Sequence, residues 1–415
     1  ERLARESGIE SRFSLAGRRN DLENIYPLLD VFVLPSLREG VPLALLEAMS
    51  SGLACIASAV GGVPDVLAGA GVLVQPGDED GLVEAIRRCA HERDTRLELG
   101  RLARIRVLER YHVEIWGERM LEVYATFAEE YMAVPVLKGV KTEKEKFAGA
   151  LRTYCIEALM QDNRALQAGT SHDLGQNFAR VFDLKFQNEA GDWTYAWNTS
   201  WGVSTRLVGA IVMAHGDDNG LVLPPRLAPV QTVVVPIWKG SDPVDRILAA
   251  AREVRDRLAR AGIAVRLDER DNLSPGFKFN EWELLGVPLR IELGPKDLER
   301  GSVMTVKRPN RAKAPVPLAD LEARVPELLG EVQKEMFEAA RARREAATFA
   351  VDSWDAFRER NDSTGGFLLA HFCGRGECET SIQEETKATV RCLAFGQSEE
   401  AGRCVRCGEP SPRRV

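Results

Sequence analysis

The hydrophobic pattern of this chain changes near residue 118, so one fold class cannot describe all 415 residues. Before that point, short apolar segments such as 30–35 (DVFVLP) and 54–57 alternate with segments of helical spacing at 43–50 and 78–91. Strands that alternate with helices predict a parallel sheet with helices on both faces. At roughly 150 residues per domain, the length predicts two to four domains.

The rest of the chain divides into three further segments. Residues 118–227 begin with a helix and continue as Gly- and Thr-rich strands, whereas 228–330 return to a βαβαβ pattern with a helix at 242–261. A long charged helix at 318–347 leads into a cysteine-rich tail. We therefore predict an α/β and α+β multidomain chain with domains at 1–117, 118–227, 228–330 and 331–415.

Composition excludes two classes of protein. The net charge of −7 argues against a protein that coats nucleic acid through bulk charge, although a local basic face stays open. The best apolar run, 207–214 (LVGAIVMA), is far below the ~18 residues that a membrane span needs. No apolar signal segment opens the chain, so we expect a cytoplasmic protein without a membrane partner. Because Glu1 is not an initiator Met, we expect the natural start to lie elsewhere.

A glycine loop between a strand and a helix indicates an anion site near the start. The strand ends at Pro35 and the helix begins near Pro42. Gly40 lets a diphosphate approach the backbone, because the N–H groups of a helix N-terminus hold anions. Glu47 inside the helix is placed to accept hydrogen bonds from ribose hydroxyls, and Glu39 on the loop to face a sugar. The alternative is that both carboxylates merely cap and solvate the helix.

Together with the turn at 60–65 (VGGVPD), these residues resemble the C-terminal half of a family 4 type glycosyltransferase, which has two Rossmann domains. That family carries Glu-x(7)-Glu and a Gly-Gly-x-Pro-Glu/Asp turn. The resemblance covers about 1–123 and implies a partial Rossmann-like domain with a nucleotide-sugar half-site at Glu39, Gly40 and Glu47. Since the family places much of its cleft in an earlier domain, we expect weak nucleotide binding without sugar transfer.

A second group of residues favours adenylate chemistry. The segment 199–206 (TSWGVSTR) is predicted as a strand that runs into an apolar helix, with Arg206 at the junction. A guanidinium offers a planar fork for phosphate and a cation that stacks on adenine. Upstream, 166–178 (LQAGTSHDLGQNF) brings together small residues, a histidine and an aromatic. Taken alone, His172 is more often a structural histidine and Trp201 a core aromatic.

With 138–149 (KGVKTEKEKFAG), these blocks resemble prolyl-tRNA synthetase of the archaeal and eukaryotic type, a class II aminoacyl-tRNA synthetase. The resemblance spans about 118–415 and implies activation of proline with ATP and Mg, then transfer to tRNA-Pro. Two other motifs of the class, which supply the dimer interface and an Arg for the α-phosphate, are not found before residue 118. We therefore expect a homodimer without its usual interface and a ligase that is incomplete.

The resemblance also assigns roles to individual residues. Arg206 would contact ATP, while Gln167 and Ser204 would lie along its ribose and phosphates. Arg206 and His172 are the catalytic candidates. The proline pocket would be walled by the ring-bearing side chains Phe147, His172, Phe178 and Trp201.

The segment 270–297 resembles the anticodon-binding domain of the same family. Single-stranded bases need an aromatic ring to stack on and polar groups to pair with their edges. Phe279 is the expected stacking platform, although a core position is equally consistent with the sequence. The groups expected to read base edges or phosphates are Glu283, Arg290, Glu292 and Lys296.

The tail carries two local pairs of cysteines, Cys373 with Cys378 and Cys404 with Cys407. Four thiolates suit tetrahedral zinc and leave no open position, so the predicted site is structural. The prolyl family has the same kind of tail. The alternative is a set of reduced cysteines without a metal. Cys392 lacks a local partner.

Three functions stay open. The first is a proline–tRNA ligase, the second a glycosyltransferase that uses a nucleotide-sugar donor, and the third a non-catalytic tRNA-binding fragment. The helix predicted at 118–132 fits both the terminal helix of the glycosyltransferase family and the helix that precedes KG-x-KTE in the synthetase family. We interpret the chain as a composite of two families joined at this helix.

Overall fold

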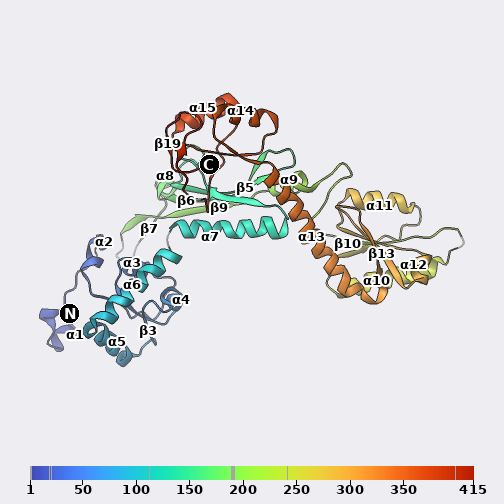
Figure 1. The fold of residues 1–415 in the computed structure, drawn as a ribbon. Helices are drawn as coiled ribbons and strands as arrows, with labels where there is room; N and C mark the ends of the chain where they lie inside the picture. Colours follow the sequence, from blue (N-terminus) through green and yellow to red (C-terminus); the bar gives the residue numbers. More distant parts are fainter. Residues whose placement is uncertain are drawn as a thin grey trace. The chain divides into compact units, whose positions relative to one another are not determined.

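The computed structural model describes residues 2–17, 19, 21–111, 113–187, 192–240, 242–397 and 399–415 (Figure 1). It divides into two compact units. The first comprises Glu1–Arg119 and Phe186–Thr194, and the second comprises Met120–Lys185 and Tyr195–Val415. The four-domain division predicted from the sequence is finer than this and stays a prediction.

The first unit is built on a small parallel sheet in the order β1-β2-β3. All five residues of the central strand are buried, which explains its largely apolar sequence ACIAS. The alternating pattern of strands and helices is therefore confirmed, and the helix expected at 43–50 has these bounds. The strands are β1 (Val31–Leu34), β2 (Ala54–Ser58) and β3 (Val72–Val74). The helices are α1 (Arg2–Glu6), α2 (Leu22–Ile25), α3 (Leu43–Ser50), α4 (Val63–Leu67), α5 (Glu79–His91) and α6 (Arg93–Arg110).

The second unit contains an antiparallel sheet in the order β17-β4-β5-β6-β9. Its first strand comes from the cysteine-rich tail, because Leu393 pairs with Val140 and Ala394 with Gly139. The segments predicted as domains 118–227 and 331–415 thus share one sheet. The strands are β4 (Val136–Val140), β5 (Arg152–Leu159), β6 (Ala165–Gly175), β9 (Asn198–Gly202) and β17 (Leu393–Ala394). In the chain, α8 (Asn177–Val181), β7 (Lys185–Gln187) and β8 (Trp193–Tyr195) come between β6 and β9, and Phe186–Thr194 belong to the first unit.

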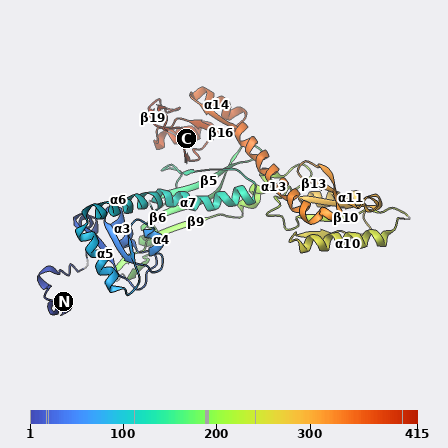
Figure 2. The same cartoon turned by 60° about the horizontal axis from the view of Figure 1, so that its bottom comes forward.

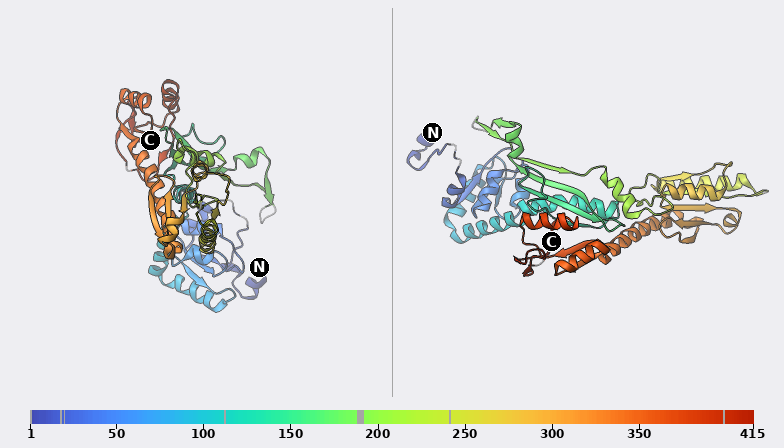
Figure 3. Two further views of the ribbon diagram at one scale, coloured as in Figure 1. Left: turned by 90° about the vertical axis from the view of Figure 1, so that its right-hand side faces the viewer. Right: turned by 90° about the horizontal axis from the view of Figure 1, so that it is seen from above.

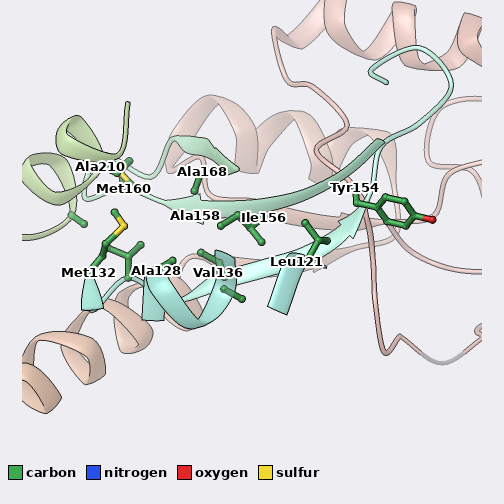
Figure 4. Close-up of a cluster of buried hydrophobic side chains, with 13 residues drawn as sticks. Leu121, Ala128, Met132, Val136, Tyr154, Ile156, Ala158, Met160, Ala168 and Ala210 are labelled. Carbon is green, nitrogen blue, oxygen red and sulfur yellow. The ribbon is translucent and has the colours of Figure 1, made fainter. Parts of the chain in front are cut away.

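One face of this sheet is covered by α7 (Val113–Thr126), by the π-helical turn Phe127–Tyr131 and by α9 (Arg206–His215). Figures 1 and 2 show α7 running alongside the strands. Leu121, Ala128 and Met132 recur at helical spacing and meet Ile156 of the sheet, as Figure 4 shows. Small side chains at the contact let helix and sheet approach closely; they are Ala158, Ala168, Ala210 and Ala214.

A second sheet in this unit has the order β11-β10-β12-β13-β14 and is parallel in its first three strands. The helix expected at 242–261 runs from Val244 to Arg260. Pro243 is its N-cap, and Gly262 ends it because its φ of +82° is not helical. The strands are β10 (Thr232–Pro236), β11 (Val265–Leu267), β12 (Leu289–Leu293), β13 (Ser302–Lys307) and β14 (Lys313–Pro317). The helices are α10 (Val244–Arg260), α11 (Pro275–Leu284) and α12 (Pro295–Glu299).

The long helix α13 (Leu321–Ala346) leads from this second sheet to the cysteine-rich part of the chain (Figure 3). It begins three residues later than expected, because Leu318–Asp320 form a 3₁₀ turn. Among the described residues, no helix combines the length and apolar content that a membrane crossing requires. The remaining elements are β15 (Thr348–Val351), α14 (Trp354–Ser363), β16 (Phe367–Ala370), α15 (Gly376–Thr386), β18 (Gly402–Arg403) and β19 (Pro410–Ser411).

Candidate functional site

Gln167 and His172 lie on the same face of the antiparallel sheet, although five residues separate them on β6. His172 pairs with Thr153 and Gln167 pairs with Glu157. Thr153 and Glu157 are four residues apart on β5 and therefore share a face. The pairing between β5 and β6 skips Ala168, which forms a bulge. Without this extra residue, the side chains of Gln167 and His172 would lie on opposite faces of the sheet. The bulge brings both candidate side chains to the face opposite to α7 and α9.

Arg206 and Ser204 join this group from the start of α9. The Arg206 guanidinium donates from Nη1 to the carbonyl oxygen of Gln167 at 3.3 Å. The backbone N–H of Arg206 donates to Ser204 Oγ at 3.3 Å. Arg206 and Ser204 are exposed, so the guanidinium has N–H groups free for a further anion. The three residues predicted for ATP are therefore neighbours, and the contact between Arg206 and Gln167 runs through the Gln167 backbone carbonyl.

Three of the four residues predicted for proline form a second cluster, which we call the aromatic group: Phe147, His172 and Phe178. The ring centroids of Phe147 and His172 are 4.7 Å apart, and those of Phe147 and Phe178 are 5.9 Å apart. Burial lowers the pKa of His172, so this imidazole is neutral near pH 7. The group can offer a small apolar ligand two rings and a neutral hydrogen-bonding side chain.

Thr153 joins two members of the aromatic group, and no sequence motif pointed to it. Its hydroxyl oxygen accepts a hydrogen bond from the backbone N–H of Phe147 at 2.9 Å. The same oxygen lies 3.0 Å from His172 Nδ1. Thr153 is buried on β5, so its role depends on strand pairing that local sequence does not encode.

Trp201 is not part of the aromatic group. It pairs with Ser171, while its neighbour Ser200 pairs with His172. Because successive side chains of a strand alternate in direction, Trp201 lies on the opposite face from His172. The register thus separates Trp201 from the other three pocket candidates, and we leave it out of the proposed proline site.

Four of the five anticodon candidates lie together, Phe279 and Glu283 on α11 and Arg290 and Glu292 on β12. Arg290 is buried, and its guanidinium lies 2.7 Å from Glu283 Oε1 and 3.0 Å from Glu292 Oε1. The same guanidinium lies 4.1 Å from the centre of the Phe279 ring, so it occupies one face of the expected stacking platform. Buried and paired in this way, Arg290 positions Phe279 and Glu283. Direct base contacts by these residues stay a prediction.

Exposed cations surround this cluster. Arg311 Nη2 lies 3.4 Å from Glu283 Oε2, and Lys313 Nζ lies 3.5 Å from Glu292 Oε2. The fifth candidate, Lys296, is exposed on α12. Arg311 and Lys313 were missed from the sequence because β13 and β14 bring them to β12 only in the folded sheet. Such cations suit the phosphates of a single-stranded nucleic acid.

The four predicted zinc ligands form a thiol cluster: Cys373, Cys378, Cys404 and Cys407. Their sulfur atoms all lie within 4.8 Å of one another, and Cys373 Sγ is 3.7 Å from Cys407 Sγ. Tetrahedral zinc with Zn–S bonds of about 2.3 Å separates its sulfur ligands by about 3.8 Å. The cluster therefore fits a closed structural zinc site without any change of fold.

In the first unit, the predicted nucleotide-sugar residues lie beside the carboxyl ends of β1 and β2. The loops that follow these strands touch, since the Gly62 N–H donates to the Gly40 carbonyl oxygen at 2.9 Å. A side chain at Gly61 would place its Cβ 1.8 Å from the Glu39 carbonyl oxygen, which explains the Gly-Gly turn. Glu47 Oε2 accepts a hydrogen bond from the Tyr26 hydroxyl at 3.2 Å. Burial and the Glu47 charge raise the pKa of Tyr26 to about 12.

A cavity of about 610 Å³ lies elsewhere in the second unit, between the antiparallel sheet and the cysteine-rich part. Its lining includes Glu157, His371 and Arg391 and none of the ATP or proline candidates. The cavity is therefore separate from the candidate site.

Comparison with protein families supports both resemblances. Residues 1–92 match the model "Glycosyl transferases group 1". Residues 231–328 match "Anticodon binding domain", and 354–415 match "Prolyl-tRNA synthetase, C-terminal". The predicted multidomain class and both family resemblances are thus confirmed.

The chain is also similar to individual proline–tRNA ligases. The proline–tRNA ligase of Cytophaga hutchinsonii is 51% identical over 298 residues, and that of Chloroflexus aurantiacus 53% over 297. These matches cover 72% and 71% of this chain and 61% of each relative. A crystal structure of prolyl-tRNA synthetase from Cryptosporidium parvum, complexed with halofuginone and AMPPNP, is 36% identical with a TM-score of 0.69. That match covers 74% of this chain and 63% of the other. The chain thus spans about 61% of the length of its curated relatives.

Proposed function

We propose that this chain, most of which is similar to prolyl-tRNA synthetases, acts in the ligation of proline to tRNA-Pro in the cytoplasm. The observation that carries the proposal is that β6 places Gln167, whose carbonyl oxygen Arg206 contacts, on the same face as His172 of the aromatic group. These residues lie in a region 51% identical to the proline–tRNA ligase of Cytophaga hutchinsonii. The anticodon-binding match and the thiol cluster lie in the same region of similarity.

In this proposal, each candidate binds or orients a substrate. The exposed Arg206 guanidinium would hold a phosphate of ATP, which would bring Mg²⁺ with it, and Gln167 and Ser204 would lie along the nucleotide. Phe147 and Phe178 would enclose the proline ring, and neutral His172 would hydrogen bond to the ligand. Zinc, when bound by the thiol cluster, would supply only structural stability.

Proline-dependent exchange between ATP and pyrophosphate tests the ligase proposal. We expect exchange that falls by about 10²-fold or more in Arg206→Ala, because one charge-assisted phosphate contact contributes on the order of 3 kcal/mol. Arg358→Ala, an exposed change on α14, is the matched control. A folded chain with no exchange at saturating proline and ATP would contradict ligase activity.

A tRNA-binding protein without ligase activity is the second candidate, favoured by the match of residues 231–328 to an anticodon-binding domain. Retention of tRNA-Pro that depends on the anticodon and survives Arg206→Ala, in the absence of exchange, would support it. Loss of retention on anticodon substitution is the expected result, and equal retention of every tRNA would contradict this candidate.

A glycosyltransferase is the third candidate, favoured by the family match at residues 1–92 and the contact of the Gly40 and Gly62 loops. Release of sugar from a nucleotide sugar, abolished by Glu47→Ala, would support it. The absence of release with several donors would count against it.

A further inference from the structure

The turn that carries Phe147 is fastened to the cysteine-rich part of the chain. The Thr142 hydroxyl donates to Glu379 Oε1 at 2.9 Å, and both side chains are buried. The same hydroxyl oxygen accepts from the Glu145 N–H at 3.2 Å. The Thr142 hydroxyl therefore donates a hydrogen bond to α15 and accepts one from its own turn. Glu379 directly follows Cys378, a member of the thiol cluster.

A second contact joins the same two elements. Lys144 Nζ donates to Thr380 Oγ1 at 3.0 Å and to Gln383 Oε1 at 2.9 Å. At the other end of the turn, the Phe147 N–H is bound by Thr153, which also contacts His172. The turn is therefore held between α15 on one side and β5 on the other.

We infer that α15, anchored by Cys378 in the thiol cluster, positions the turn at 142–147 and through it the aromatic group. Thr142 and Glu379 are then positioning residues, because they act on Phe147 through the backbone and touch no substrate. The inference rests on the proposed function only in assigning the aromatic group to proline. The mechanical link itself is measurable without catalysis.

Thr142→Val tests the link, because it keeps the shape of the side chain and removes the hydroxyl. Hydrogen exchange of residues 141–150 should become about tenfold faster in the full chain. The NMR signal of the His172 Cε1 proton should shift as well, since its ring lies 4.7 Å from the Phe147 ring. Thr142→Ser keeps the hydroxyl and should restore both readouts to the wild-type values.

Glu379 offers an independent pair of variants. Glu379→Ala should reproduce the faster exchange, and Glu379→Gln should not, because its amide oxygen still accepts from Thr142. Glu384→Ala, at an exposed position of α15, is the matched control. If Thr142→Val fails to fold, Glu379→Ala and Glu379→Gln test the link in its place.

Unchanged exchange and an unchanged His172 signal in folded Thr142→Val, or in folded Glu379→Ala, would overturn the inference. Failure of Thr142→Ser or Glu379→Gln to restore the wild-type values would overturn it as well. If the link is found but proline-dependent exchange is absent, the positioning stands and the proline assignment falls.

Discussion

His215 ends α9, and at the scale of the single residue it makes stability depend on pH. Burial lowers the pKa of its imidazole to about 4, and the charge of Arg343 acts in the same direction, against the bond to the Met132 carbonyl oxygen. Between about pH 6.5 and 4, the unfolded chain binds a proton that the folded chain does not. As the pH falls from about 6.5 to about 4, the free energy of unfolding should therefore decrease by about 3 kcal/mol.

His215→Gln is the variant that checks this, since its amide can still donate to Met132. Urea unfolding of both proteins across the window should show a shallower pH dependence in the variant. Equal slopes for the two proteins would contradict a neutral His215 in the folded state.

Lys141 forms a buried ion pair, also at the residue scale. Its Nζ lies 2.6 Å from Glu157 Oε1, and both side chains are almost inaccessible, at 3% and 0%. Lys141→Met leaves the carboxylate with the half-exposed Arg391 alone, which should cost about 3–5 kcal/mol of unfolding free energy. Lys138→Met, which breaks an exposed pair with Glu122, should cost less than about 1 kcal/mol. Equal losses in chemical denaturation would refute the distinction.

At the scale of the element, β17 depends on a glycine of β4. A Cβ at Gly139 would lie 2.5 Å from the Leu393 carbonyl oxygen and 2.8 Å from Cys392 Sγ. Gly139→Ala should therefore displace β17 and lower the unfolding free energy by about 1–3 kcal/mol. Gly202→Ala, where nothing lies within 4 Å, is the matched control. Comparable melting temperatures for the two variants would show that β17 adapts without cost.

The sequence predicts single helices and strands better than it predicts which of them pair or contact one another. The helix at 43–50 and the strands of the first unit follow from local periodicity, which needs no tertiary information. The bulge at Ala168 and the side of the sheet that receives Trp201 depend on register between strands. The link from Thr142 to Glu379 joins residues 237 positions apart, so no local pattern could predict it.

At the scale of the whole molecule, the thiol cluster should stabilise more than the tail that contains it. Structural zinc contributes on the order of 10–16 kcal/mol to the folding of a small domain. Since β17 and α15 join this tail to the antiparallel sheet, chelation should lower the melting temperature of the second unit. Elemental analysis should find one zinc per chain. A chain free of metal whose melting is unaffected by chelator would contradict the site.

The pairing of β17 with β4 has a consequence for biosynthesis. Lys141 and Arg391, which meet beside these strands, are 250 positions apart in the chain. A ribosome releases residues in order, so a sheet begun at β4 keeps an open edge until Leu393 and Ala394 have emerged. Contacts between such distant positions form slowly, and an open edge invites association with other nascent chains. Premature termination before β17 would thus leave the earlier strands of this sheet exposed to aggregation, even where β4, β5, β6 and β9 are all present.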